Sequence, residues 1–153
     1  MDQNHKELVE KLFTGTSFTL SEGNKIVPTF FMILPDNKLM PVVTTETIAL
    51  KEYASITIRY ADEMNAEALI LICEQYMVSK KKYDPILQSI LAGKIKPSDH
   101  PDRKSYLTVN YMSAIGETET IISEIHSDLK GTRYNREHSW LHSSLTNIMV
   151  PWR

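Results

Sequence analysis

The amino-acid sequence predicts an α+β fold, with residues 1–153 forming a single domain. We expect a mostly antiparallel sheet of about five or six strands and two or three helices. Three observations support this class: apolar residues recur at helical spacing, β-rich runs follow one another near both ends, and 153 residues suit one core. Consecutive strands favour an antiparallel sheet with its helices on one face.

The first elements are a short helix and a hairpin. Apolar residues share one helical face over residues 6–13, and Gly15 suits the end of that helix. Residues 25–45 contain two β-rich runs around "PDNK", which is typical of a hairpin turn. Pro28 and Pro41 each remove a ladder donor, so they favour edge positions or bulges.

The middle of the chain alternates helix and strand. Spacing of three and four predicts a helix over residues 46–64 that stops at Asn65. Residues 66–78 contain "ALILIC" and read as a strand buried on both faces. In residues 84–93, Asp84, Pro85 and Gly93 stand at the start and end positions of a short helix.

Two further strands, residues 105–116 and 118–126, meet at a turn made by Gly116 and Glu117. "DLKG", residues 128–131, is the next turn. For the tail, residues 132–153, the sequence leaves open whether it begins as a strand, while Trp152 suggests that its end docks on the core.

Composition excludes several classes of function. A net charge of −2 offers no general attraction to nucleic acid or anionic lipid. The apolar runs are too short to span a bilayer, and the single cysteine, Cys73, fits a reducing cytoplasmic setting. With 5 glycines and no nucleotide-binding or nucleophile motif, no cofactor is expected.

The densest polar stretch is "SDHPDRKS", residues 98–105. In a catalytic interpretation His100 is a general base and Asp102 orients it. We favour a structural turn, in which Pro101 limits the conformations and Asp99 or Asp102 bonds the local backbone. Such a turn would place Arg103 against Glu74, whose carboxylate follows the most apolar strand and needs a partner.

Other candidates carry weaker signals. His138 and His142 lie four residues apart, but the zinc-peptidase motif lacks its glutamate, so no metal is expected. Cys73 lies in an apolar run and is expected to be unreactive. The lysines of "SKKKYD", residues 79–84, favour a solvated loop over a nucleic-acid contact.

Three segments together carry a resemblance: "PTFFMILPDNKLMPV", "EALILICEQYMV" and "HPDRKSYLTV". Their order resembles a group of small uncharacterised bacterial and phage-related proteins. In that group a strand ends in a glutamate followed by an aromatic residue, and an HPDR-like turn opens the next strand. Glu74 and Tyr76 match the first feature, and His100 to Arg103 match the second. The resemblance implies a bacterial or phage-related origin and no particular chemistry.

Three functions remain open. The first is a non-catalytic interaction or regulatory domain, whose partner would be a second copy or another protein. The second is a small enzyme with a dispersed site made of Glu74, His100, Asp102 and Arg103. The third is a nucleic-acid accessory protein that uses the lysine cluster. A flat apolar patch would favour the first and a deep polar pocket the second.

Overall fold

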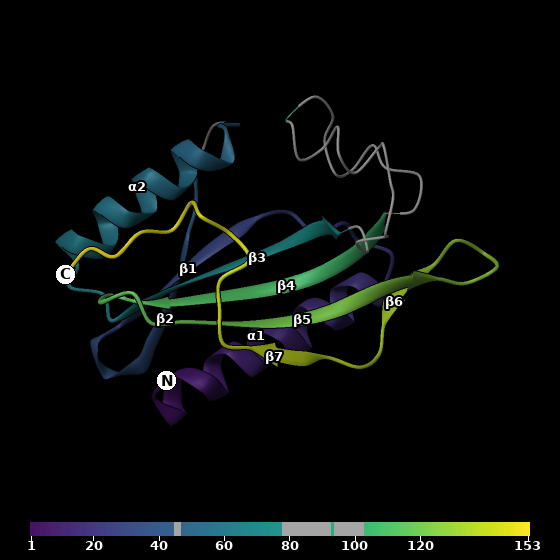
Figure 1. Ribbon diagram of the computed structural model, residues 1–153, viewed down its shortest axis with the longest axis horizontal. Helices are drawn as coiled ribbons and strands as arrows, with labels where there is room; N and C mark the ends of the chain where they lie inside the picture. Colours follow the sequence, from purple (N-terminus) through teal and green to yellow (C-terminus); the bar gives the residue numbers. More distant parts are fainter. Residues whose placement is uncertain (45–46, 78–92, 94–102) are drawn as a thin grey trace.

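The computed structural model describes residues 1–44, 47–77, 93 and 103–153 (Figure 1). In this part of the chain two helices and one curled antiparallel sheet form an α+β domain, as the sequence predicted. The strands are β1 (Thr29–Leu34), β2 (Lys38–Val42), β3 (Ala68–Met77), β4 (Lys104–Ser113), β5 (Thr118–Ser127), β6 (Arg133–Asn135) and β7 (Ser139–Leu141). The helices are α1 (Gln3–Ser21) and α2 (Leu50–Glu63), and a short 3-10 turn, η1 (Pro35–Asn37), joins β1 to β2.

The sheet has the order β2-β1-β3-β4-β5-β6, and β7 also pairs with β5. The apolar strand β3 lies between β1 and β4, and its pairing with β4 runs from Ala68 opposite Ser113 to Met77 opposite Lys104. The expected hairpin is present, with Pro41 in β2, which pairs with β1 at one edge of the described sheet. The tail does begin with strand structure, since β6 and β7 both pair along the outer side of β5.

Helix α1 is longer than the sequence indicated. It continues through Gly15 to Ser21, so the expectation that it stops near Gly15 is wrong. A glycine inside a helix costs only about 0.5–1 kcal/mol, and burial of Leu20 on the last turn offsets that cost. The helix ends at Ser21, and the φ of 88° at Gly23 lets Gly23 N–H and Asn24 N–H donate to the carbonyls of Leu20 and Thr19.

Helix α2 ends where the sequence predicted. Asn65 adopts a left-handed φ of 54°, and its N–H donates to Asp62 while Ala66 N–H donates to Ala61. One face of the helix buries Ala54, Thr57 and Ala61. The chain therefore turns sharply from α2 into β3.

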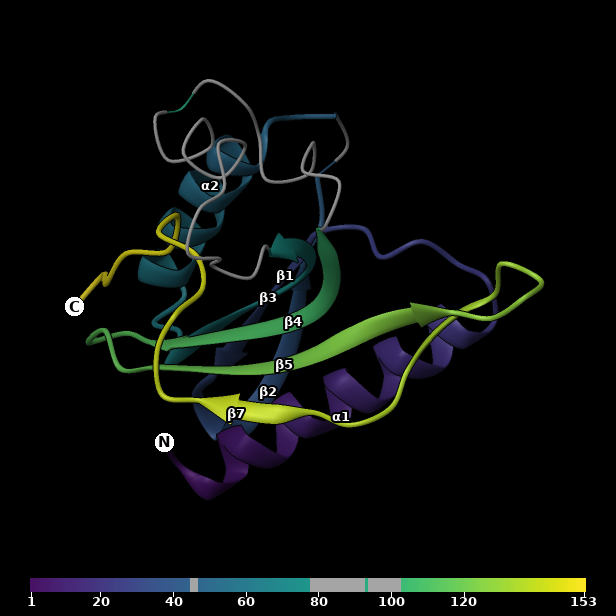
Figure 2. The same ribbon diagram turned by 45° about the vertical axis from the view of Figure 1, so that its right-hand side comes forward.

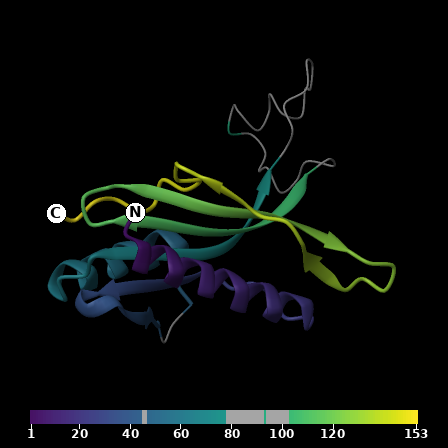
Figure 3. The same cartoon turned by 90° about the horizontal axis from the view of Figure 1, so that it is seen from below.

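The two helices cover opposite faces of the sheet, as Figures 2 and 3 show. Helix α1 contributes Val9 and Phe13 to a core with alternate residues of β3 and β4, among them Ile70 and Val109. Helix α2 joins a second core on the other face, with Leu69 and Leu71 of β3 and the strand-end residue Met112 of β4. The expectation that the helices share one face is therefore wrong. Because β3 is apolar on both faces, it needs cover from both sides.

The tail after β7 crosses the α2 side of the sheet (Figure 2). Met149 is buried in the second core, and Trp152 packs against this core. The indole N–H of Trp152 donates to the Ala66 carbonyl at 3.2 Å. The prediction that Trp152 docks is confirmed. The expected short helix at residues 84–93 lies outside the described residues, apart from Gly93.

Neither α1 nor α2 combines the length and apolar character that crossing a membrane would require, within the residues that the structure describes.

Candidate functional site

Glu74 lies where the sequence placed it, in the last part of β3, and the structure brings to it a cation that the sequence did not indicate. Its carboxylate forms an ion pair with Arg133 of β6, and the two side chains are 17% and 32% exposed. The guanidinium of Arg103 lies over the ring of Tyr76, 5.5 Å from its centroid. The coupling of Glu74 with Arg103 stays a prediction, while the ion pair that the structure shows was missed.

His100, Pro101 and Asp102 lie outside the described residues, and so do the lysines 80–82. Of the alternative enzyme site the structure places Glu74 and Arg103, and both side chains already contact another residue.

The histidines and the cysteine of the described chain are dispersed. His138 stacks on Phe13 at 4.7 Å between ring centroids, His142 contacts Glu119 at 2.9 Å, and His126 packs beside Tyr134. Cys73 is a buried free thiol, and burial raises its pKa while a hydrogen bond with Thr108 opposes that shift. Among the described residues, no group of three or more His, Cys, Asp or Glu side chains has a metal-binding arrangement.

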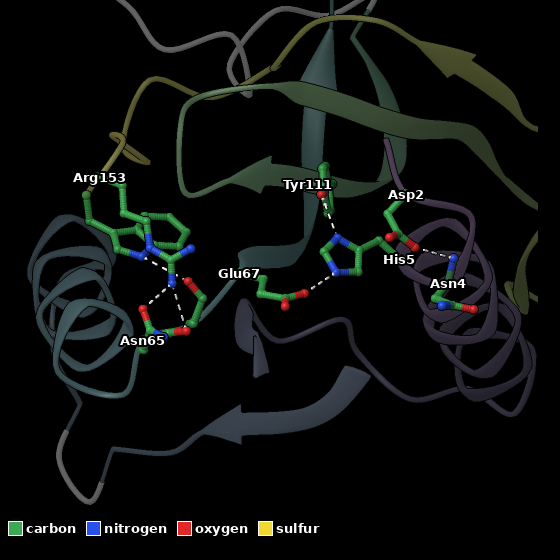
Figure 4. A network of polar contacts seen from close by, with 9 residues as sticks. Asp2, Asn4, His5, Asn65, Glu67, Tyr111 and Arg153 are labelled. Atoms are coloured by element: carbon green, nitrogen blue, oxygen red, sulfur yellow. Dashed lines mark hydrogen bonds and ion pairs between the residues drawn. The ribbon is translucent and has the colours of Figure 1, made fainter. Parts of the chain in front are cut away.

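The structure reveals a buried polar network that sequence reasoning missed (Figure 4). His5 of α1 lies between Tyr111 of β4 and Glu67, which precedes β3. The distances are 2.8 Å from Nδ1 to the tyrosine hydroxyl and 2.9 Å from Nε2 to the carboxylate. His5 and Tyr111 are buried, whereas the Glu67 side chain is 41% exposed.

The Glu67 carboxylate limits the hydrogen-bond directions in this network. An ionised carboxylate only accepts, so His5 Nε2–H donates to Glu67, while His5 Nδ1 faces the Tyr111 hydroxyl. Burial, followed by the nearby carboxylates of Glu117 and others, raises the pKa of Tyr111. The two hydrogen bonds of His5 therefore join α1 to β4 and to the start of β3.

A second polar group lies under the tail, on the α2 face of β3, β4 and β5. Asn110 donates to the Leu71 carbonyl and accepts from Thr120, and Thr120 Oγ1 also lies 2.8 Å from the Ser143 carbonyl. Gln75 donates to the Leu145 carbonyl at 3.0 Å. These bonds hold the tail in place over buried side chains, so their role is structural.

Two surface hollows lie along α1. Their volumes are about 570 and 350 Å³, they flank the helix, and Lys11 lines both. The first is lined by Asn4, Glu7, Leu8, Glu10, Lys11, Thr14 and Asn37. The second is lined by Leu12, Gly15, Thr16, Thr19, Lys25, Ile26, Val27, Thr29, Phe31 and Ile72 together with Lys11. We call the two hollows, the exposed side of α1 between them and the adjoining tip of the β5–β6 hairpin the α1 face.

Three exposed apolar side chains lie on the last turns of α1, in the loop that follows it and on the tip of the β5–β6 hairpin. Phe18 is 64% exposed on the last turns of α1, and Val27 is 69% exposed in the following loop. Leu129, at the tip of the β5–β6 hairpin, is fully exposed. Large apolar groups left in water on adjoining elements are typical of a binding surface. The sequence signal for Phe18 was its position out of phase with the buried His5, Val9 and Phe13.

Comparisons of the chain with protein-family models, with curated proteins and with solved structures gave no match.

Proposed function

We propose that this chain is a non-catalytic protein-interaction domain, of bacterial or phage-related origin, that binds its partner through the α1 face. The observation that carries the proposal is the exposed Phe18 on α1, beside hollows that Leu8 and Leu12 help to line. Aromatic side chains beside shallow apolar hollows are the usual anchors of protein interfaces. Because Cys73 is a buried free thiol, we assign the domain to the cytoplasm.

Two polar contacts in the described chain support a structural role for the residues that form them. Glu74 is held by Arg133, and His5 is held between Tyr111 and Glu67. Each group thus stabilises the packing of the elements that present the α1 face. A binding domain needs this rigidity, since a preformed surface loses less conformational entropy when it binds.

Photo-crosslinking in cells tests the proposal. A benzophenone amino acid replaces Thr14, which is exposed on α1, and in a matched protein it replaces Ser55, which is exposed on α2. We expect irradiation to give a discrete protein adduct from position 14 but not from position 55, and Phe18→Lys to abolish that adduct. The absence of any adduct specific to position 14 would reject the α1 face as a binding surface.

A further inference from the structure

We infer that the α1 face binds a second copy of this chain, with the two α1 helices antiparallel across a two-fold axis near Phe18. This inference rests on the proposed function, because it names the partner of the same surface. A two-fold interface must be self-complementary, so each half of the surface must fit the other half. The α1 face meets this requirement in its arrangement of apolar groups and of charge.

One half of the surface is a protruding apolar tip. The β5–β6 hairpin extends beyond the C-terminal end of α1 and bends toward the α1 side of the sheet (Figure 3). At its turn, the N–H groups of Lys130 and Thr132 donate to Asp128 Oδ1 at 2.8 and 2.9 Å. These bonds order the turn, so Leu129 is presented to solvent on a preformed support that loses little entropy on binding.

The other half is the hollow on the N-terminal part of α1, which Leu8, Glu7 and Glu10 help to line. Phe18 lies on the helix between this hollow and the hairpin. Because α1 is about 28 Å long at 1.5 Å per residue, a half-turn about Phe18 moves the tip of one copy toward the hollow of the other. Leu129 would then cover Leu8, and the two Phe18 rings would meet at the axis.

The balance of charges agrees with this arrangement, because Glu7 and Glu10 outnumber Lys11 in the lining of the N-terminal hollow. Lys130 follows Leu129 at the tip, and Lys25 lines the same hollow as Lys130 beside the hairpin. The Asp128 carboxylate is directed back to the backbone of its own turn, and Arg133 is paired with Glu74. In the antiparallel dimer, Lys130 and Lys25 approach Glu7 and Glu10 of the other copy, which favours this register over a parallel one.

Sedimentation equilibrium tests the inference directly. We expect the wild-type chain to form a dimer at micromolar concentrations and Phe18→Lys or Leu129→Lys to weaken dimerisation at least about tenfold, as loss of a central anchor does. The matched control is Tyr60→Lys, because Tyr60 is 48% exposed on α2 and should change the dissociation constant less than about twofold. Circular dichroism would confirm that each variant is folded.

A charge exchange tests the register. The variant K25E/K130E has acidic residues at both halves of the surface, and E7K/E10K has basic residues at both. Each variant alone should dimerise at least about tenfold more weakly than wild type, and an equimolar mixture should form heterodimers, because unlike charges then meet at both contacts.

The outcomes separate this inference from the proposed function. A wild-type chain that stays monomeric up to a few hundred micromolar, a dimer insensitive to F18K and L129K, or a mixture that fails to form heterodimers would each overturn it. A position-14 adduct that contains a different protein would then leave the proposed function standing without the dimer. Absence of both dimer and adduct would reject both.

Discussion

The Cys73 side chain contacts Thr108 inside the sheet, 3.3 Å from sulfur to hydroxyl oxygen, and it is only 4% exposed. Burial raises the pKa of this thiol from its ordinary value of 9.0, so little of the reactive thiolate forms near neutral pH. We expect thiol reagents to label native Cys73 at least about a hundredfold more slowly than the denatured chain, because access requires opening of a core strand. Labelling followed at pH 8 with and without urea measures the ratio, and equal rates would show that β3 is not protected.

Tyr111 should make stability fall at high pH. Its folded pKa is raised above the unfolded value of 10.0, so above pH 10 the unfolded chain loses this proton while the folded chain keeps it. This contribution to the free energy of unfolding is therefore complete below about pH 10 and declines as the pH rises further.

The matched variant is Tyr111→Phe, which leaves His5 Nδ1 without its partner. We expect it to cost about 1–3 kcal/mol at pH 8, the penalty of an unsatisfied buried group. The difference from wild type should shrink between pH 10 and 11.5 in urea unfolding, since the variant has no such proton to lose. A difference that stays constant across this range would contradict the assignment.

A double-mutant cycle measures the coupling free energy of the Glu74–Arg133 ion pair. With both side chains less than one-third exposed, we expect Glu74→Gln and Arg133→Ala to couple by about 1–3 kcal/mol in urea unfolding. A parallel cycle with Arg103→Ala tests the pairing that the sequence suggested. Additive losses in the first cycle would show that Arg133 does not stabilise Glu74.

At the scale of elements, the tail after β7, residues 142–153, covers part of the second core. Met149 is 3% exposed, whereas its neighbour Val150 is 51% exposed. We expect Met149→Ala to lower the free energy of unfolding by about 2–4 kcal/mol and Val150→Ala by less than about 0.5 kcal/mol. Equal, small effects in urea unfolding would show that the tail does not contribute to the core.

Local sequence signals predicted an element well where one residue or one short run decides its geometry. Asn65 marked the end of α2 because few side chains tolerate a left-handed backbone, and "ALILIC" marked the central strand because it is apolar on both faces. The prediction that the first helix stops near Gly15 was wrong because a glycine permits a helix end without requiring one. The observed end of α1 depends on Gly23 and on the burial of Leu20. Both residues lie beyond residues 6–13, the range that the sequence predicted for this helix.

At the scale of the whole molecule, sequence proximity does not reveal contacts between distant strands. Sequence order indicates Arg103 as a partner for Glu74 because Arg103 precedes the next strand, whereas the structure also brings Arg133 of β6 to Glu74, although β4 and β5 lie between β3 and β6 in the sheet order. The expectation that both helices cover one face of the sheet was wrong because it rested on local spacing. The spacing of apolar residues shows that a helix has an apolar face, but it does not show which side of the sheet the helix covers. The network of His5, Glu67 and Tyr111 joins three distant segments and has no local signature.

The two chain ends lie at the same end of the molecule, away from the β5–β6 tip (Figure 1). Asp2 and Arg153 line one small hollow of about 250 Å³, and Arg153 is fastened to Asn65 beside it. A fluorescent protein or surface tether fused to either end would therefore lie far from Leu129. Labels at both ends would report almost the same point in space, so energy transfer between them would be strong in the folded chain and weak in the unfolded one.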